Sequence, residues 1–474
     1  MVELLKPDLC IIGAGSGGLD LAAGAATLGK KVVLVEKDKT GGARLKTAVP
    51  AKALIVAARH AHRIAQAEAF GLVAPPATVD FEKLRAHLAA VVGALTADSA
   101  KEWVGAMGVR VVQGSAQFKS RRRLAIEDII EIDARRYVIA TGSLPALPDI
   151  QGLTETLYLT EDTMLGLTRV PDHLIVIGAG TTALEYAQAF RRLGAAVTVL
   201  DAGLPLPQED PECVRIVLDV LGREGVRVRA GVAIARVGGG PLNKVEVVLS
   251  SPDGGEETIE GSHLLIAPAR RPNVDGLALE AARVKHGPHG ITVNAHLRTS
   301  NRAVYAIGDA AGAGGFEHVA RHHAALLLRT LVLGQFARLN ANVLPRVTFT
   351  DPELAQVGLT EAAAARRRRG FRLLRWPLHE NDRAHIEREP AGHIKVVTTP
   401  GGRILGATIV GAQAGELIAP WALAVGQHLN VRAFAVTVFP YPIRGDIGKR
   451  AAMTYFNPGM TRTWVQRIMG RLRR

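Results

Sequence analysis

Residues 9–36 read LCIIGAGSGGLDLAAGAATLGKKVVLVE. The apolar run Leu9–Ile12 is typical of a buried strand in a parallel sheet. Glycines in the order G-x-G-x-x-G follow it, then an alanine-rich segment, and then a second apolar run that ends at Glu36. A strand, a glycine turn, a helix, a strand and a terminal acid in this order predict a βαβ unit that binds a dinucleotide.

Each residue type in this unit has a physical role. Gly13 allows the tight turn, and Gly15 lets the backbone approach a pyrophosphate at the N-terminus of the helix. Gly18 allows the helix to pack closely on the strand. Glu36 can accept hydrogen bonds from the hydroxyl groups of a ribose.

The same unit occurs a second time in residues 173–201, which read HLIVIGAGTTALEYAQAFRRLGAAVTVLD. Gly178, Gly180 and Ala183 repeat the fingerprint, with alanine in the third position. Asp201 ends the second strand, at the same distance from the first glycine as Glu36 in the first unit. Two such units predict two dinucleotides held against each other, as hydride transfer between a nicotinamide and a flavin requires.

Length and composition are those of a globular, multidomain protein. The 474 residues suffice for about three domains, and 48% are apolar and 22% charged. Two cysteines, Cys10 and Cys213, exclude a disulfide framework, and we interpret both as inert. Because no apolar run is long enough to span a membrane and the N-terminus runs directly into the first strand, we expect a cytoplasmic protein.

The net charge of +14 indicates a basic surface. The arginine runs are not interleaved with aromatic residues, so we expect no nucleic-acid partner. Attraction of anionic cofactors and of membrane surfaces explains the charge better. The sequence also predicts no metal site.

The chain resembles the class I pyridine nucleotide–disulfide oxidoreductases, the family of dihydrolipoamide dehydrogenase, glutathione reductase and mercuric reductase. The similarity covers roughly residues 7–456. Besides the two glycine-rich units, it rests on ATGS at 140–143, RRPN at 270–273, AIGD at 306–309 and FTDPELAQVGLTE at 349–361. It implies an α/β fold with two Rossmann-type domains, one for FAD and one for NAD(P), and a C-terminal α+β dimerisation domain in a homodimer.

The resemblance also implies how the chain is divided. We expect the first part of the FAD domain at 1–149, the NAD(P) domain at 150–280, the second part of the FAD domain at 281–342, the dimerisation domain at 343–456 and a basic tail at 457–474. The residue pattern also predicts a helix over 81–107 in the first part and another over 416–430 in the dimerisation domain.

The resemblance further implies roles for individual residues. Asp309 should bond the ribityl chain of FAD, and Glu36 the adenosine ribose. Lys52 and Glu185 occupy positions that form an ion pair beside the flavin, where a lysine favours electron density on the reduced ring. The predicted cofactor-binding residues are Gly13, Gly15, Gly18, Glu36, Lys37, Gly42, Lys52, Ala140, Thr141, Gly142, Gly178, Gly180, Ala183, Glu185, Asp201, Arg271, Gly308, Asp309 and His318.

The chain departs from the family at the redox disulfide. The family places two cysteines, with four residues between them, against the flavin. The corresponding residues 41–52 read GGARLKTAVPAK, with Arg44 at the first cysteine position and Ala48 near the second. No thiol is therefore expected at the flavin. If Arg44 faces the flavin, its guanidinium would favour an anionic reduced ring or hold an anionic acceptor.

A second departure lies near the C-terminus. The disulfide reductases of the family carry a His-Pro…Glu dyad there, and the histidine takes the thiol proton. Here Tyr441 and Asp446 replace the histidine and the glutamate. Both departures remove parts of the same thiol chemistry. Tyr441 has two interpretations, a phenol that donates to the carbonyl of an acceptor or a packing ring.

These observations predict an FAD-dependent NAD(P)H oxidoreductase. Hydride would pass from NADH to FAD and then directly to a small acceptor such as a quinone, without a disulfide relay. The alternatives are a soluble NAD(P) transhydrogenase, a dihydrolipoamide dehydrogenase-like or mercuric reductase-like enzyme by homology, and a non-catalytic FAD-binding subunit. Asp201, which no arginine follows closely, predicts a preference for NADH over NADPH.

The C-terminal tail has a two-sided pattern. Its apolar residues share one helical face, and arginines surround them. The apolar face consists of Trp464, Val465, Ile468, Met469 and Leu472. One interpretation is a helix that is frayed or packed in the dimer, and the other is a weak anchor to an anionic membrane surface.

Overall fold

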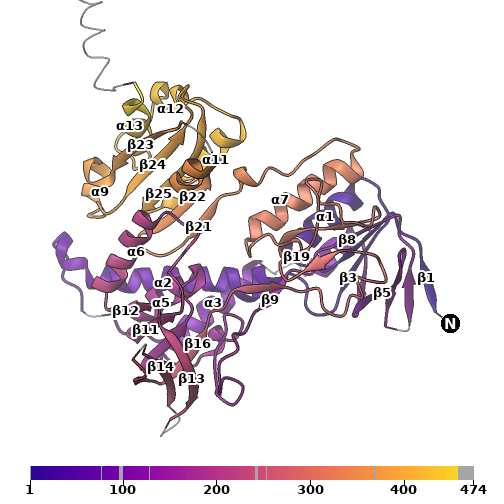
Figure 1. Ribbon diagram of the computed structural model, residues 1–474, viewed down its shortest axis with the longest axis horizontal. Coiled ribbons are helices and arrows are strands. Elements are labelled where there is room, and N and C mark those ends of the chain that lie inside the picture. Colours follow the sequence, from indigo (N-terminus) through magenta and orange to yellow (C-terminus); the bar gives the residue numbers. More distant parts are fainter. Residues whose placement is uncertain are drawn as a thin grey trace, which may run out of the picture. The chain divides into compact units, whose positions relative to one another are not determined.

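The computed structural model describes residues 2–75, 77–95, 100–127, 129–240, 244–251, 253–367 and 370–456. It consists of two compact units, and Figure 1 shows their helices and strands with labels. Unit 1 comprises Met1–Asp149, Tyr158–Val170 and Leu265–Asn340, and unit 2 comprises Ile150–Leu157, Pro171–Leu264 and Ala341–Arg474. The tail at 457–474, with its two interpretations, lies outside the described residues.

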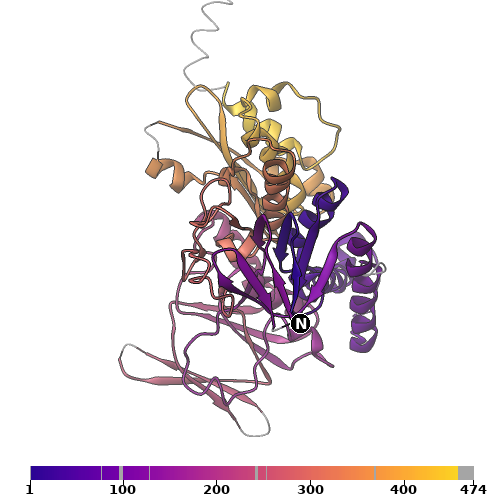
Figure 2. The same ribbon diagram turned by 90° about the vertical axis from the view of Figure 1, so that its right-hand side faces the viewer.

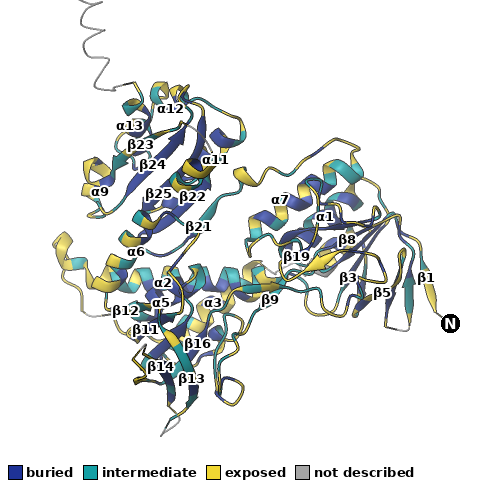
Figure 3. Cartoon of the chain, viewed as in Figure 1, coloured by how far each residue is buried: buried dark blue, intermediate teal, exposed yellow. Residues whose placement is uncertain are grey.

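Unit 1 is built on a five-stranded parallel sheet with β2 (Leu9–Ile12) at its centre. Along β2 successive side chains point to opposite faces, so Ile11 packs toward the helices and Cys10 packs toward the other face. The strands in order are β20 (Val304–Ala306), β8 (Arg136–Ile139), β2, β3 (Val32–Glu36) and β4 (Arg110–Gln113). Burial on both faces explains why β2 and β3 read as continuous apolar runs, and the predicted first βαβ unit is confirmed (Figure 3).

Helices and a second sheet cover the two faces of this parallel sheet. The helices α1 (Ser16–Thr27) and α7 (Glu317–Leu327) lie side by side on one face. The other face packs on a sheet of β1 (Glu3–Leu5), β7 (Ile130–Ile132), β6 (Arg123–Ile126) and β5 (Ala116–Ser120).

The remaining helices of unit 1 follow β3 in the sequence. A π-helical turn, Arg44–Ala48, leads into α2 (Val49–Ala65), and a short turn at Ala67–Phe70 follows it. The helical pattern expected over 81–107 comprises α3 (Phe81–Leu95) and α4 (Ala100–Ala106), and residues 96–99 lie outside the described part. The strands β9 (Ser143–Pro145) and β17 (Arg270–Pro272) pair with each other, as do β18 (His286–Gly287) and β19 (Gly290–Ile291).

Unit 2 contains the second βαβ unit. β10 (His173–Ile177), β11 (Ala196–Asp201) and β12 (Val226–Ala230) are parallel, and β16 (His263–Ile266) lies beside β10. The helices are α5 (Thr181–Arg192) and α6 (Pro211–Arg223). The antiparallel strands β13 (Ala233–Gly239), β14 (Val245–Ser250) and β15 (Glu256–Gly261) form a separate sheet, which Figure 2 shows from a second side.

The C-terminal part of unit 2 is an antiparallel sheet covered by short helices. Its strand order is β21 (Arg346–Thr348), β22 (Glu353–Gly358), β25 (Ile404–Gly411), β24 (His393–Thr398) and β23 (Arg372–Pro377). The helices are α8 (Glu361–Arg367), α9 (Asp382–Ile386), α10 (Ala414–Leu417), α11 (Ala419–Gly426), α12 (Arg432–Val436) and α13 (Asp446–Thr454).

The sequence-based prediction of one helix over 416–430 is wrong in its extent. The pattern over 416–430 is divided into α10 and α11, and α11 ends at Gly426. Pro420 lies at the start of α11, and because proline has no N–H group it is tolerated at a first turn but not inside a helix. In the part of the chain that the structure describes, no helix combines the length and the apolar character needed to cross a membrane.

Candidate active site

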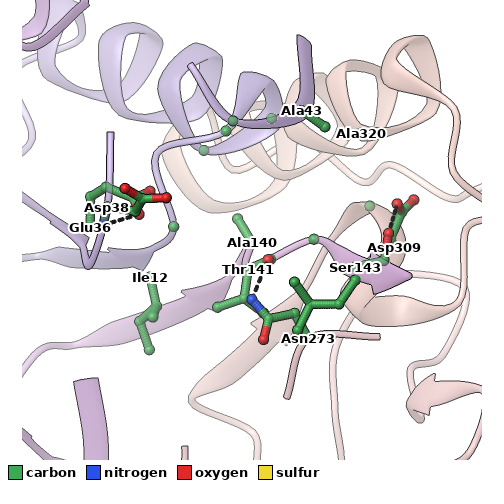
Figure 4. A pocket seen from close by; sticks show the side chains of 18 of the residues that line it. Ile12, Glu36, Asp38, Ala43, Ala140, Thr141, Ser143, Asn273, Asp309 and Ala320 are labelled. Atoms are coloured by element: carbon green, nitrogen blue, oxygen red, sulfur yellow. Dashed lines mark hydrogen bonds between the residues drawn. The ribbon is translucent and has the colours of Figure 1, made fainter. Parts of the chain in front are cut away.

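A groove of about 350 Å³ lies at the carboxyl ends of the parallel strands of unit 1 (Figure 4). Ligands of open α/β sheets bind at this edge. The groove is lined by the turns that follow β2, β8 and β20, and by the acid at the end of β3. The predicted cofactor-binding residues that line it are Gly13, Gly15, Gly18, Glu36, Lys37, Gly42, Ala140, Thr141, Gly142, Gly308 and Asp309.

Two glycines of the first turn are required by their surroundings. Gly13 has a φ of +107°, and a Cβ atom there would lie 2.5 Å from the carbonyl oxygen of Ala140. A Cβ atom on Gly18 would lie 2.0 Å from the carbonyl oxygen of Gly13. Any larger residue would collide with the backbone at both positions, so only glycine allows α1 and β8 to approach the turn this closely.

Gly15 has a different environment. It is the N-cap of α1, with a φ of −74° that any residue can adopt, and nothing lies within 4 Å of a Cβ atom built on it. No side chain caps α1. The N–H groups of its first turn are therefore available to an anion, which the helix dipole would also attract. Gly180 has the same geometry at the start of α5.

The acids of the two units make matching hydrogen bonds. Glu36 Oε2 accepts the N–H of Ala14 at 2.7 Å, and Asp201 Oδ2 accepts the N–H of Ala179 at 2.6 Å. Each acid therefore fastens the glycine turn to the end of the neighbouring strand. A carboxylate oxygen has a second lone pair, so each acid can still accept a hydrogen bond from a ribose hydroxyl.

Asp309 is held by two donors. Its Oδ2 accepts the hydroxyl of Ser143, and its Oδ1 accepts the N–H of Gly315 at 2.9 Å (Figure 4). Ser143 in turn accepts a hydrogen bond from Nε of Arg270 at 2.8 Å, and Arg270 forms an ion pair with Glu161. The carboxylate of Asp309 is thus one end of a connected network, whose first three members line the groove.

His323 supports the turn that carries Asp309. Its Nδ1 accepts the N–H of Gly308 at 3.2 Å, and its side chain is buried. Burial and the neighbouring His322 lower the pKa of His323 to about 4, although Asp309 acts in the opposite direction. The ring is therefore neutral at neutral pH and carries its proton on Nε2, which has no hydrogen-bond partner among the described residues.

Two buried hydroxyl groups of the groove lack partners. Ser16 Oγ and Thr141 Oγ1 make no hydrogen bond with any described residue, although both residues line the groove. Buried polar groups in folded proteins are nearly always hydrogen-bonded. These two hydroxyls are therefore suited to bind a polar ligand.

The turn at 44–48, where the resemblance would place the family's redox disulfide, is π-helical. The N–H of Val49 donates to the carbonyl of Arg44, so the hydrogen bond joins two residues with four others between them. Arg44 begins this turn and Ala48 ends it, and both stand near the positions expected for the family's two cysteines. None of Arg44, Ala48 and Val49 has a thiol. Lys46 in the same turn forms an ion pair with Asp38.

The predicted ion pair of Lys52 and Glu185 involves both units. Lys52 is half-buried in the first turn of α2 in unit 1. Glu185 is buried in α5 of unit 2, where its Oε1 accepts the N–H of Phe349 at 2.7 Å. Their pairing beside the flavin stays a prediction. Gly178, Gly180 and Ala183 form the second glycine turn and the start of α5, as the sequence predicts.

Tyr441 and Asp446, which are expected at the positions of the family's dyad, have different partners. The hydroxyl of Tyr441 donates to Asp382 Oδ2 at 2.8 Å, whereas Asp446 accepts a hydrogen bond from Nε of Arg450 at 3.0 Å. The hydrogen bond to Asp382 raises the pKa of Tyr441. Tyr441 is 80% exposed, so its ring does not pack within the described part of this chain.

Some predicted residues of unit 1 do not line the groove. They are Arg44, Lys52, Arg271 and His318. Arg271 is exposed and pairs with Asp275, while its neighbour Arg270 faces the groove. Ser16, Ser143 and Arg270 line the groove but were not predicted to do so, although Ser143 ends the ATGS motif and Arg270 begins RRPN. No sequence pattern identified His323.

Comparison with known proteins agrees with this geometry. Residues 7–326 match the family model of pyridine nucleotide-disulphide oxidoreductases, and residues 344–452 match that family's dimerisation domain. The chain belongs to this family. A mercuric reductase of Streptomyces lividans is 35% identical over 94% of this chain and 96% of its own length. A dihydrolipoyl dehydrogenase of Thermus scotoductus is 36% identical over 92% of this chain and 94% of its own length.

A solved structure of the family has the same fold. LpdA from Mycobacterium tuberculosis superimposes with a TM-score of 0.84 at 28% identity, covering 95% of this chain and 99% of that one. Membership in the family confirms the predicted fold class and the predicted cofactors. The chain is an FAD-dependent oxidoreductase of pyridine nucleotides, and its dimerisation domain indicates a homodimer.

Proposed function

We propose that this protein passes electrons from NADH through FAD directly to a small acceptor such as a quinone. The observation that carries the proposal is the absence of a thiol from the turn at 44–49. The two cysteines of the chain are fully buried elsewhere, Cys10 in β2 and Cys213 in α6. Burial raises the pKa of both thiols, so neither is a thiolate at neutral pH.

The groove of unit 1 fits FAD. The uncapped N-terminus of α1 would hold the pyrophosphate, Glu36 the adenosine ribose and Asp309 the ribityl chain. Ser16 and Thr141 supply hydroxyl groups that have no partner among the described residues. Bound FAD supplies the capacity to take a hydride from NADH and to release electrons to the acceptor. The side chain of Arg270, partly buried beside Ser143, would add positive charge to the groove.

We retain both interpretations of Tyr441, a phenol that donates to the carbonyl of the acceptor or a packing ring. Its phenol is protonated at neutral pH, because the hydrogen bond to Asp382 raises its pKa. Its proton is directed at Asp382, so donation to an acceptor carbonyl would require the phenol to exchange partners. An exposed ring of this kind can equally pack against another molecule, such as the second subunit of the dimer.

A weak membrane contact of the tail at 457–474 would bring the enzyme to a lipid-soluble quinone.

The choice of acceptor separates the proposal from its alternatives. Under anaerobic conditions and with NADH as donor, we expect turnover with a soluble quinone or a diaphorase-type dye to exceed turnover with NADP⁺ and lipoamide. Faster turnover with NADP⁺ would instead indicate a transhydrogenase. If NADH failed to reduce the flavin at all, the protein would be a non-catalytic FAD-binding subunit.

The nicotinamide site should prefer NADH to NADPH. Both oxygens of Asp201 already bind backbone N–H groups, of Ala179 and Gly203, so the carboxylate is fixed in place. A fixed carboxylate can bond the 2′-hydroxyl of NADH and repel the 2′-phosphate of NADPH. A hydrogen bond to a charged group contributes about 1.5–3 kcal/mol, so we expect a ratio of kcat/KM values on the order of tenfold or more. Asp201→Asn should narrow this ratio without changing the FAD content, whereas a higher kcat/KM with NADPH in the wild type would contradict the assignment.

A further inference from the structure

The segment 202–210 connects Asp201 to α6 and is held at several points. At its start, the N–H of Gly203 donates to Asp201 Oδ1 at 2.7 Å. In its middle, Leu206 is buried, and its N–H donates to the carbonyl of Ala179 in the second glycine turn at 3.2 Å. The segment therefore touches both the acid and the turn of the second βαβ unit.

Arg346, the first residue of β21, holds the far end of the segment. Its Nε donates to Glu209 Oε1 at 2.8 Å, and its Nη2 lies 3.4 Å from Glu209 Oε2. The same Nη2 approaches the carbonyl of Gln208 at 3.5 Å. Glu209 is nearly buried, with 10% of its side chain exposed, so this pair is less accessible to water than an ordinary surface ion pair.

Lys395 of β24 binds Asp210, the last residue of the segment. Its Nζ lies 2.9 and 3.0 Å from the two oxygens of Asp210, and both side chains are almost fully buried. Asp210 is also the N-cap of α6, where its Oδ1 accepts the N–H groups of Glu212 and Cys213. α6 itself packs against β22 and β25 of the same antiparallel sheet (Figure 1).

We propose that Arg346 and Lys395 are positioning residues for the nicotinamide nucleotide. They belong to the part of the chain that matches the dimerisation domain, and they fix the segment that presents Asp201 to the adenosine ribose. The proposal rests on the proposed binding of NADH at the second βαβ unit. It assigns to the antiparallel sheet a part in nucleotide recognition beyond dimerisation.

Arg346 is the better residue to change. Lys395 also contacts Glu212 and Glu361, so its removal would leave three carboxylates without their buried counter-ion and would endanger folding. Arg346 is partly exposed, and among the described residues it pairs with one carboxylate only. Arg346→Met keeps most of the length of the side chain and removes the charge.

In the FAD-loaded, full-length protein, Arg346→Met should raise KM for NADH about five- to tenfold, with kcat and FAD content unchanged. The NADH to NADPH ratio of kcat/KM should fall, because the segment that carries Gly203, whose N–H binds Asp201 Oδ1, is less firmly held. Arg346→Lys should restore most of the NADH affinity. The matched control is Arg236→Met on β13 of the same unit. It breaks the ion pair of Arg236 with Glu256 on β15 and should leave KM unchanged.

The dissociation constant for NAD⁺, measured by calorimetry, distinguishes a failure of the proposed function from a failure of the positioning role of Arg346. If the wild type binds NAD⁺ but is not reduced by NADH, the proposed function fails, and the positioning role is still tested by the weaker NAD⁺ binding expected of Arg346→Met. If Arg346→Met matches Arg236→Met in KM, in nucleotide preference and in NAD⁺ affinity, the positioning role is wrong. Failure of the wild type to bind NAD⁺ would overturn both.

Discussion

Anaerobic titration with dithionite will bleach the flavin of the FAD-loaded protein completely at one electron pair per FAD. A disulfide reductase takes up a second pair because its thiols store electrons beside the flavin. Here Arg44, Ala48 and Val49 occupy the turn where such thiols would lie. The protein should also show no long-wavelength absorption band, since that band requires a thiolate that donates charge to the oxidised flavin.

The absence of thiols beside the flavin should also limit which acceptors the enzyme reduces. We expect no reduction of lipoamide, glutathione disulfide or Hg²⁺ above background with NADH as donor. The matched control is the double variant Cys10→Ser, Cys213→Ser, which should give the same titration, because both thiols are buried and neutral. Uptake of a second electron pair, or lipoamide turnover that thiol alkylation abolishes, would refute the proposal that electrons leave the flavin directly.

Replacement of Gly15 by valine should give a folded but colourless protein. Nothing lies within 4 Å of a Cβ atom at Gly15, and the backbone there suits any residue, so the protein itself accommodates the side chain. The same side chain would occupy the place of the pyrophosphate at the N-terminus of α1. We expect FAD affinity to fall at least about a hundredfold, which corresponds to ~2.8 kcal/mol. Circular dichroism should match that of the wild type stripped of FAD.

Gly180→Val is the matched control for this change. Gly180 has the same backbone geometry in the second unit, so its valine variant should stay yellow and lose its reduction by NADH instead. Gly18→Ala should behave differently from both, because its Cβ would collide with the backbone of Gly13 and destabilise unit 1 with or without cofactor. A Gly15→Val protein with unchanged FAD affinity would show that the pyrophosphate does not lie at this turn.

The strands and helices that follow from local sequence patterns could be predicted from the sequence. The strand Leu9–Ile12 was predicted with its observed bounds, because a buried parallel strand is a continuous apolar run and the glycine turn marks its end. The long helix expected at 416–430 was wrong, although Pro420 was a visible signal of the break.

The contacts that fix the site join residues far apart in the chain. Ser143 lies 166 positions from Asp309, and Arg346 lies 137 positions from Glu209. A hydroxyl or a guanidinium leaves no periodic pattern that identifies its partner, so these pairs become visible only when the chain is folded. His323 is a further example, because a buried neutral histidine looks like any helical histidine in the sequence.

The burial of the two cysteines makes each of them an internal probe of motion. Cys10 lies in the central strand of unit 1 and Cys213 in a helix of unit 2, and neither has exposed surface. A thiol reagent can reach such a side chain only when the surrounding structure opens, so the labelling rate measures the free energy of that opening. Because each unit has one cysteine, the two rates report the local stability of each unit separately, without any introduced label.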